Sequence, residues 1–329
     1  MKVRELQAKD LEKLYAFNDR MFPEREVKSR EYMQFWLSKS AEEMNYDFVI
    51  VDDNDDIHGE ILSSTMSYFY DGELSDSLWG FDLIVEDELR KEGWGVDIQL
   101  YRNQIYPVSF GTGVAPTALK IQSKMGYALL GHIRKFACVV SPFWAALSVV
   151  RKRVSPDNYP DSITCGGHSF IKTRRENLPN LNKPFNEHLW EPARDNNYLS
   201  WRYFSPLHEY VFYKDSNSDN FFVMRSVVFK HLVVNMLVDY RCDIKSAESV
   251  ESIIKAAEKV TKSIHLGVLV TGSSLASLDN VLKKRHYIEM GDPRPINGII
   301  KVKDRKKDIE SRDFCFVTFA DSDGETDIV

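Results

Sequence analysis

The sequence predicts a mixed α/β protein made of two similar halves. Segments rich in β-branched and aromatic residues, which favour strands, alternate with segments whose apolar residues recur at helical spacing. The length of 329 residues exceeds the usual size of a single hydrophobic core. Residues 108–131 can also be laid over residues 268–291 without a gap. Identities are few, so chance is the alternative, but both segments predict strand, turn, helix and aromatic residue in that order.

The first half is predicted to be one domain over residues 1–150. Its strands are bounded by turn residues, and its helices show apolar spacing behind a capping residue such as Asp10. The expected strands lie within 3–6, 47–56, 59–70, 78–85 and 106–113, and helices follow Asp10 and lie within 115–127.

Residues 151–194 are predicted to be a linker, because five prolines fall in a stretch with little periodicity. Regular structure resumes in a second domain over residues 195–329. Its expected strands lie within 209–213, 220–229, 231–240 and 266–272, and its expected helices start near Val250 and within 274–284.

Composition narrows the function classes. A net charge of −6 argues against broad nucleic-acid binding, which needs a basic face. The four cysteines are scattered, which suits free thiols in a reducing compartment better than a disulfide framework or a zinc site. The longest uncharged run, Phe136 to Val150, contains Pro142 and is shorter than the roughly 20 residues that span a bilayer. The charged N-terminus does not resemble a signal peptide, so a cytoplasmic protein without membrane contact is expected.

The segment Gly93-Trp94-Gly95 predicts an anion site at a strand-to-helix turn. Backbone N–H groups without side chains in the way, together with the helix dipole, favour a phosphate or pyrophosphate. Arg90 and Lys91 add positive charge beside the turn. The third glycine of a dinucleotide fingerprint and the lysine of a Walker loop are absent. The alternative is a surface turn whose glycines only satisfy backbone geometry.

The stretch from Arg90 to Gly95 fits the Q/R-x-x-G-x-G/A acyl-CoA signature of the GNAT acyltransferases. The preceding strand, the following helix and the later Lys-Met-Gly-Tyr also fall where that family has them, so the first 150 residues or so resemble a GNAT domain. The second half resembles a degenerate copy, because residues 238–253 carry no glycine where the turn should be. Residues 198–204 and 316–327 resemble segments of tandem-GNAT proteins that act in surface-polysaccharide pathways, above all N-acyltransferases for amino sugars carried on dTDP.

The resemblance implies direct transfer of an acyl group from acyl-CoA to an amine, without a metal. Backbone amides of Leu83, Ile84 and Val85 are then expected to lie beside the thioester and to polarise its carbonyl. The pyrophosphate is expected on the amides of the turn, with the Arg90 side chain close by; these amides are those of Lys91, Glu92, Gly93, Trp94, Gly95 and Val96. The tyrosine that is the frequent general acid of the family is replaced by Gln122, so the leaving thiolate takes its proton elsewhere or from water.

Asp82 is the first candidate for the general base. It is a carboxylate in an otherwise apolar strand, where burial would raise its pKa. The alternative is an aspartate that faces solvent or pairs with a cation. His132 and His168 are weaker candidates, and a chain of waters without a protein base is a further possibility.

Aromatic and cationic residues suggest an acceptor site for a nucleotide-linked sugar, which needs a stacking surface and cations for its diphosphate. Tyr68 and Tyr70 on an early strand and Trp201 and Arg202 in the second half are the candidates, and core packing is the alternative for each.

The leading acceptor is a dTDP-amino sugar such as dTDP-3-amino-3,6-dideoxyhexose, and the cosubstrate is acetyl-CoA or a longer or hydroxylated acyl-CoA such as 3-hydroxybutyryl-CoA. The alternatives are a protein or aminoacyl-tRNA acceptor, or a non-catalytic CoA-binding protein. A monomer or weak dimer is expected.

Overall fold

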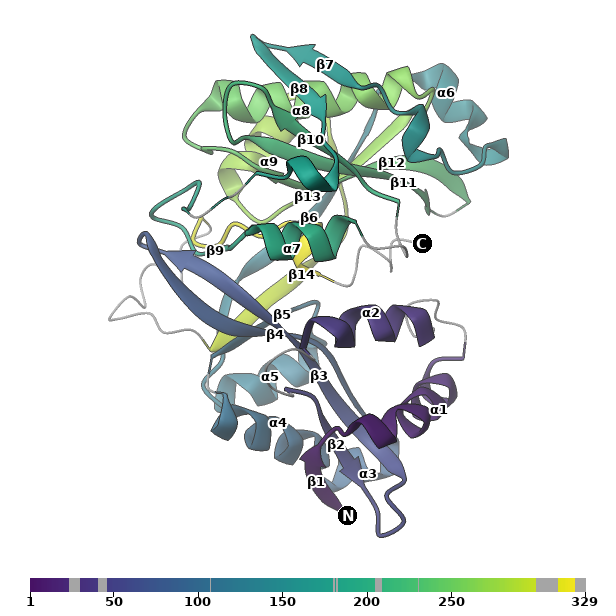
Figure 1. Cartoon of the computed structure of the whole chain (residues 1–329), viewed down its shortest axis with the longest axis vertical. Helices are drawn as coiled ribbons and strands as arrows, with labels where there is room; N and C mark the ends of the chain where they lie inside the picture. The colour runs from purple at the N-terminus through teal and green to yellow at the C-terminus, as the bar shows by residue number, and fades with distance from the viewer. Residues whose placement is uncertain are drawn as a thin grey trace. The chain divides into compact units, whose positions relative to one another are not determined.

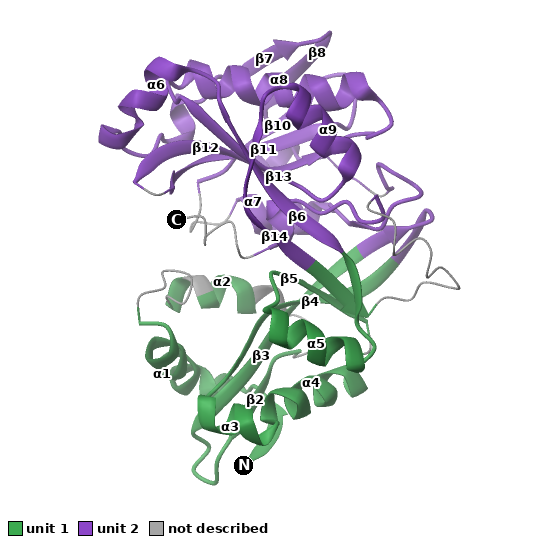
Figure 2. Cartoon of the chain, turned by 180° about the vertical axis from the view of Figure 1, so that it is seen from behind, with its two compact units in different colours: residues 1–67, 75–130, 296–306 green, residues 68–74, 131–295, 307–329 purple. Residues whose placement is uncertain are grey.

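The computed structural model describes residues 1–23, 30–40, 46–106, 108–179, 181, 183–204, 209–229, 231–299 and 313–322. The chain forms two compact units that do not follow the order of the sequence (Figure 2). Unit 1 consists of Met1–Ser67, Ser75–Leu130 and Ile296–Lys306. Unit 2 consists of Tyr68–Leu74, Gly131–Pro295 and Lys307–Val329. Both contain helices and strands, so the mixed α/β class is confirmed.

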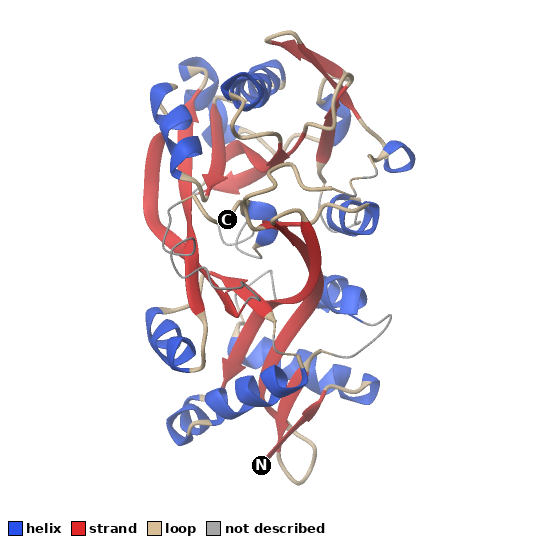
Figure 3. Ribbon diagram, turned by 90° about the vertical axis from the view of Figure 1, so that its left-hand side faces the viewer, coloured by secondary structure: helices blue, strands red, loops and turns tan. Residues whose placement is uncertain are grey.

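Unit 1 is a twisted sheet in the order β1-β2-β3-β4-β5-β14 with helices on both faces (Figure 1, Figure 3). Strand β14 (Ile288–Ile299) contributes its last residues, which pair antiparallel with β5. The other strands are β1 (Lys2–Glu5), β2 (Phe48–Val51), β3 (Ile57–Tyr70), β4 (Glu73–Val85) and β5 (Ser109–Thr112), and the helices are α1 (Leu11–Met21), α2 (Arg30–Ser40), α3 (Asp87–Glu92), α4 (Trp94–Ile105) and α5 (Pro116–Lys124).

The two faces of this sheet bury different clusters. On one face, Leu14 and Phe17 of α1, at helical i, i+3 spacing, pack with Leu62 and Ile84 of the sheet. On the other face, Ile98 of α4 packs with β2 and β3 residues. Because successive strand residues point to opposite faces, membership of these clusters reports the direction of each side chain.

Asp47, just before β2, is a buried carboxyl of unit 1. Burial raises its pKa to about 7, against the hydrogen bond at 2.7 Å that its Oδ1 accepts from the Ser63 N–H. The unfolded chain has a lower pKa, about 4, so folding stability is fully present below pH 4 or so and is lost as pH rises through about 7. We expect Asp47→Asn to remove this loss. Relative to the native chain, the variant should gain up to about 1.4 kcal/mol per pH unit across that window.

Urea unfolding at pH 4.5, 6 and 8 or so measures this, with Asp53→Asn at an exposed position as the control. Parallel pH profiles for the native chain and Asp47→Asn would show that Asp47 is ionised throughout the window.

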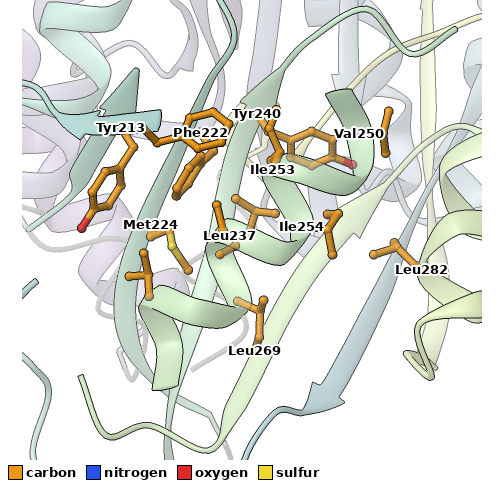
Figure 4. Close-up of a cluster of buried hydrophobic side chains, with 14 of the residues drawn as sticks. Tyr213, Phe222, Met224, Leu237, Tyr240, Val250, Ile253, Ile254, Leu269 and Leu282 are labelled. Atoms are coloured by element: carbon orange, nitrogen blue, oxygen red, sulfur yellow. The ribbon is translucent and has the colours of Figure 1, made fainter. Parts of the chain in front are cut away.

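Unit 2 contains the strands in the order β6-β13-β12-β11-β10-β8-β7, and β9 pairs with the end of β3. A hydrophobic cluster lies where α8 and α9 cover these strands, with Ile253, Leu237 and Leu269 among its members (Figure 4). Its strands are β6 (Ala128–Val139), β7 (Ser162–Cys165), β8 (His168–Lys172), β9 (Glu191–Pro192), β10 (Val211–Asp215), β11 (Phe221–Phe229), β12 (Leu232–Arg241) and β13 (Val268–Ser273), and its helices are α6 (Pro142–Leu147), α7 (Asn196–Tyr203), α8 (Ala247–Ser263) and α9 (Ala276–Lys284).

The linker predicted over residues 151–194 is wrong, because this stretch is part of unit 2. Strands β7 and β8 form a hairpin, and β8 pairs antiparallel with β10. The five prolines lie outside β7 and β8, so no ladder hydrogen bond of these two strands is lost to a proline. The chain therefore does not divide at residues 150 and 194.

The 160-residue shift found in the sequence reappears in the elements. Helix α5 spans Pro116–Lys124 and α9 spans Ala276–Lys284, so both ends differ by 160 residues. The same shift relates β6 (Ala128–Val139) to β14 (Ile288–Ile299). The two halves therefore repeat one succession of elements.

The last strands of the two halves are exchanged. Residues 134–139 of β6, from the first half, pair antiparallel with β13 inside unit 2. Residues 296–299 of β14, from the second half, pair antiparallel with β5 inside unit 1. Each half thus supplies a strand to the sheet formed mainly by the other half.

Among the helices that the structure describes, none is both long enough and apolar enough to cross a lipid bilayer.

Candidate functional site

Strand β4 contains a bulge at Asp82. Phe81 packs against the cluster under α1 and α2, with its ring 5.2 Å from that of Trp36. Leu83, two residues on, packs against the opposite cluster under α4. Residues two apart in a regular strand share a face, so one extra residue has been inserted between them. The bulge therefore turns the strand at Asp82.

The bulge marks the point where β4 and β5 separate. Their parallel ladder pairs Leu78 with Ser109 and ends at Gly80 opposite Gly111. Beyond it, a cavity of about 240 Å³ is lined by both strands and by α4 and α5. Its polar lining consists of Asp82, Gln99, Arg102, Thr112, Gln122, Tyr127 and Asn297.

Backbone direction after the bulge distinguishes the three predicted amides. The carbonyl oxygen of Ile84 lies toward β3, where a Cβ added to Gly59 would approach it to 3.1 Å. The N–H and C=O of one strand residue point the same way, so the Ile84 amide also faces β3. By alternation, the amides of Leu83 and Val85 face the open side.

The glycine turn, predicted to lead from a strand into a helix, instead joins two helices, because residues 87–92 form the short helix α3. Gly93 ends α3 in the left-handed region, at φ 97°, and precedes the first residue of α4. Its carbonyl accepts from the N–H groups of Val96 (2.8 Å) and Asp97 (3.2 Å). Lys91 and Glu92 lie in the last turn of α3. The amides of Trp94 and Gly95 are therefore those at the N-terminus of α4 with the geometry to receive an anion.

Arg90 packs against the turn. Its Nη2 donates to the Val85 carbonyl at 3.0 Å and to Asp87 Oδ1 at 2.5 Å, and its side chain stays largely exposed. The Trp94 indole N–H donates to Glu92 Oε2 at 3.2 Å. The Arg90 side chain, predicted to lie beside the anion site at the glycine turn, is thus present there, together with the acidic residues Asp87 and Glu92.

Arg102 is a cavity residue that sequence reasoning missed. Its guanidinium is buried and donates to Tyr127 Oη (2.6 Å), Ser109 Oγ (3.2 Å), Asn103 Oδ1 (3.3 Å) and Ser63 Oγ (3.3 Å). An arginine on a helix is usually a surface residue, and its contacts here come from three separate segments. Local pattern therefore gave no signal for it.

Gln122, at the position of the family's tyrosine, faces the same cavity from α5. Its Oε1 accepts a hydrogen bond from Asn297 Nδ2. The Tyr127 hydroxyl also lines the cavity and donates to Asn103 Oδ1 at 3.1 Å. A phenol is thus present in this cavity, five residues after the position where the sequence lacks one.

The candidate bases lie in different surroundings. Asp82 is half-buried and lines the cavity. His168 belongs to unit 2, where its Nδ1 lies 2.8 Å from Asp215 Oδ2. His132 lies on β6 and also belongs to unit 2. The cavity lining therefore supports Asp82 alone among the three.

The predicted acceptor residues lie in unit 2, and two of them are core. Tyr68 is 1% exposed and packs on Trp190 at 5.3 Å. Arg202 is fully buried in α7, where Nε donates to the Ala320 carbonyl and Nη1 to the Tyr210 hydroxyl at 2.9 Å. Tyr68 and Arg202 are therefore core residues, and the prediction that they bind the substrate is wrong.

Tyr70 and Trp201 are half-buried. Tyr70 packs on Phe314 at 5.5 Å and Trp201 on Tyr198 at 5.9 Å. Each therefore keeps part of its ring at the surface of unit 2.

In unit 2, the parallel strands β12 and β13 also separate, as β4 and β5 do in unit 1, but the space between them is filled. Strand β12 has a register shift that leaves Val238 unpaired between Leu237 and Asp239, and its parallel ladder with β13 ends at Leu237. The space beyond is taken by the segment 316–321, since a Cβ on Gly272 of β13 would meet the Phe319 ring at 2.8 Å. Residues 323–327, the end of the stretch quoted from the sequence, lie outside the described residues.

The helix that follows β12 is capped by its own sequence. Ser246 Oγ accepts from the N–H of Ser249 at 3.2 Å, at the N-terminus of α8. This serine takes the role that an anion would have at a glycine turn. The filled space beyond β12 and the capped helix agree with the prediction that the second half is a degenerate copy.

The sequence matches no protein-family model, and no curated protein matches it. Solved structures do. A probable N-acyltransferase from Enterococcus faecalis is 9% identical with a TM-score of 0.59, over 90% of this chain and 71% of that one.

A GCN5-related N-acetyltransferase from Anabaena variabilis is 12% identical with a TM-score of 0.58, over 90% of this chain and 72% of that one. Saccharomyces cerevisiae N-myristoyltransferase, solved with bound myristoyl-CoA, is 12% identical with a TM-score of 0.56, over 91% of this chain and 82% of that one. The bulge in β4, the separation of β4 from β5 and the glycine turn agree with these structural likenesses. The chain has the fold of the GCN5-related N-acetyltransferases.

Proposed function

We propose that the chain is a CoA-dependent N-acyltransferase whose active site lies in unit 1. One observation carries the proposal: β4 and β5 separate beside a cavity, and the N-terminus of α4, which follows a glycine, has no side-chain cap hydrogen bond. The pyrophosphate of CoA would bind the amides of Trp94 and Gly95. The pantetheine would follow the open side of β4.

The chemistry needs a polarised thioester carbonyl, an unprotonated amine and a proton for the leaving thiolate. The amides of Leu83 and Val85 face the open side of β4 and would stabilise negative charge on the carbonyl oxygen. Asp82, at the bulge, would accept a proton from the attacking amine. The nitrogen then bonds to the acyl carbon, the carbon–sulfur bond breaks, and the thiolate is protonated.

The acceptor is the amine of a small molecule, with a dTDP-amino sugar as the first to test. A net charge of −6 favours it over aminoacyl-tRNA. Residues 198–204 and 316–322, which carry the likeness to sugar-modifying proteins, are largely buried, so they support the architecture more than a given acceptor. Tyr70 and Trp201 remain the proposed stacking residues, and a cytoplasmic monomer or weak dimer without a metal remains the proposed state.

Free-thiol release from acyl-CoA, measured with a panel of amines, tests the function. We expect turnover with a dTDP-amino sugar, and less with the UDP-linked sugar, a free amino sugar, a peptide amine or aminoacyl-tRNA. Asp82→Asn should lower kcat by about 10²–10⁴-fold with little change in CoA affinity. Asp76→Asn, at an exposed position on the same strand, is the matched control.

Each other outcome has a meaning. Turnover with peptides or tRNA alone would transfer the proposal to a macromolecular acceptor. Tight CoA binding without thiol release for any amine would make the chain a CoA-binding protein and not an enzyme. Equal rates for Asp82→Asn and Asp76→Asn would leave proton removal to water.

A further inference from the structure

The Arg102 guanidinium is buried without a counter-charge. Arg102 is 4% exposed, and the four groups to which its guanidinium donates are neutral. Among the residues that the structure describes, no carboxylate lies within 4 Å of it, and its Nε has no hydrogen-bond partner. In unit 2, by contrast, Arg194 and Arg241 are paired with aspartates. Because burying an ion without a partner is unfavourable, this site gains by receiving an anion.

The guanidinium lies beside the bulge. A Cβ on Gly80, the last residue of the β4–β5 ladder, would sit 3.1 Å from Arg102 Nη1. Glycine at this position therefore lets the cation approach the backbone of β4 just before Asp82. Arg102 and Asp82 both line the cavity, so an anion is favoured at the arginine and disfavoured at the bulge.

One amide side chain adds hydrogen-bonding capacity. Gln99 Oε1 is buried without a hydrogen-bond partner, and this residue lines the cavity. Turned by 180°, the Gln99 amide presents its NH₂ in place of its oxygen, whereas Asn297 is held by the hydrogen bond that its Nδ2 donates to Gln122 Oε1. Guanidinium and amide donors together match the oxygens of a carboxylate. The cavity volume of about 240 Å³ is several times the roughly 30 Å³ share of a water molecule.

We propose that Arg102 binds a carboxylate at the far end of the acyl group, so that the cosubstrate is a short dicarboxylic acyl-CoA of the succinyl type. This rests on the proposed function, because it assigns the acyl group of that same site. An acceptor could carry the carboxylate instead, but the cavity lies at the bulge, where the thioester is proposed to bind. The carboxylate is therefore assigned to the acyl chain.

Isothermal calorimetry with four-carbon acyl groups tests the assignment without an acceptor. Butyryl-CoA ends in a methyl, 3-hydroxybutyryl-CoA carries a hydroxyl, and succinyl-CoA ends in a carboxylate; unmodified CoA is the reference. We expect succinyl-CoA to bind about ten- to a hundredfold more tightly than butyryl-CoA, the effect of one charge-assisted contact. The ratio should fall to about one in Arg102→Gln and be partly kept in Arg102→Lys.

Arg134→Gln, at a partly buried arginine of unit 2 that pairs with Asp279, is the matched control and should keep the native ratio. If unmodified CoA does not bind, the proposed function falls and this inference with it. If CoA binds but the three acyl-CoAs bind alike, or butyryl-CoA binds best, only the carboxylate assignment is overturned. Should Arg102→Gln fail to fold by circular dichroism, the native series and Arg102→Lys decide.

Discussion

Replacing Asp239 by alanine should lower the free energy of unfolding by about 3–5 kcal/mol, because it removes one of the two buried carboxylates that pair with the guanidinium groups of Arg194 and Arg241 and leaves Asp321 alone to pair with both. Asp239 Oδ2 lies 2.7 Å from Arg194 Nε, and its Oδ1 lies 2.7 Å from Arg241 Nη1. Thr318 Oγ1 donates to the same carboxylate at 2.7 Å. All five residues are buried. Chemical denaturation with urea measures the loss.

Acid should weaken the same cluster in the same direction. Burial alone would raise the pKa of Asp239, but Arg194 and Arg241 outweigh it and hold the pKa at about 2. Because the pKa of Asp239 is lower in the folded than in the unfolded chain, the stability it contributes is present above the unfolded pKa, about 4, and is lost as pH falls through about 2.

The control for Asp239→Ala is Asp219→Ala, at a half-exposed aspartate 3.8 Å from Lys214, which should lower the free energy of unfolding by under about 1 kcal/mol. Similar losses for both variants would show that the cluster is not a buried charge network.

Gly95→Val should abolish binding of CoA, with at least a hundredfold loss of affinity, while the protein stays folded. A branched side chain at the start of α4 would block the approach of phosphate to the amides of Trp94 and Gly95. The fold tolerates the change, because a Cβ at Gly95 would lie 3.7 Å from Val85 Cγ2, an ordinary contact. Gly93 is the poorer choice, since φ of 97° strains any other residue.

Gln104→Val places the same side chain at an exposed position in the last turn of α4 and should leave CoA affinity unchanged. Calorimetry with CoA, run beside thermal melting, separates binding from stability. Unchanged affinity in a well-folded Gly95→Val would show that the turn is only a turn.

Sequence reasoning succeeded where the signal was local. The repeat was predicted from strand, turn and helix patterns, and its shift holds for α5 against α9 because helix ends depend on nearby residues. The position of the glycine turn was likewise set by Gly93, where only a left-handed residue fits. Both features depend on the order of residues within a short continuous segment.

Sequence reasoning failed where contacts between segments distant in sequence determine the structure. The linker prediction missed β7 and β8, because β8 is held in the sheet by β10, which lies about 40 residues further along the chain. Arginine is a residue type that often binds anionic ligands. Arg202 instead donates to the carbonyl of Ala320, which is distant in sequence, and is buried in the core. Arg102 was missed because its role depends on Gly80 in a neighbouring strand.

The exchanged strands have a consequence for the history of the chain. If the halves arose by duplication, trading their last strands made each copy a structural dependant of the other, since a sheet that loses β6 or β14 exposes an unpaired edge. Neither copy could then be deleted, so both would remain under selection for folding. This is the condition under which a cleft in one copy can be filled by a later segment of the same chain.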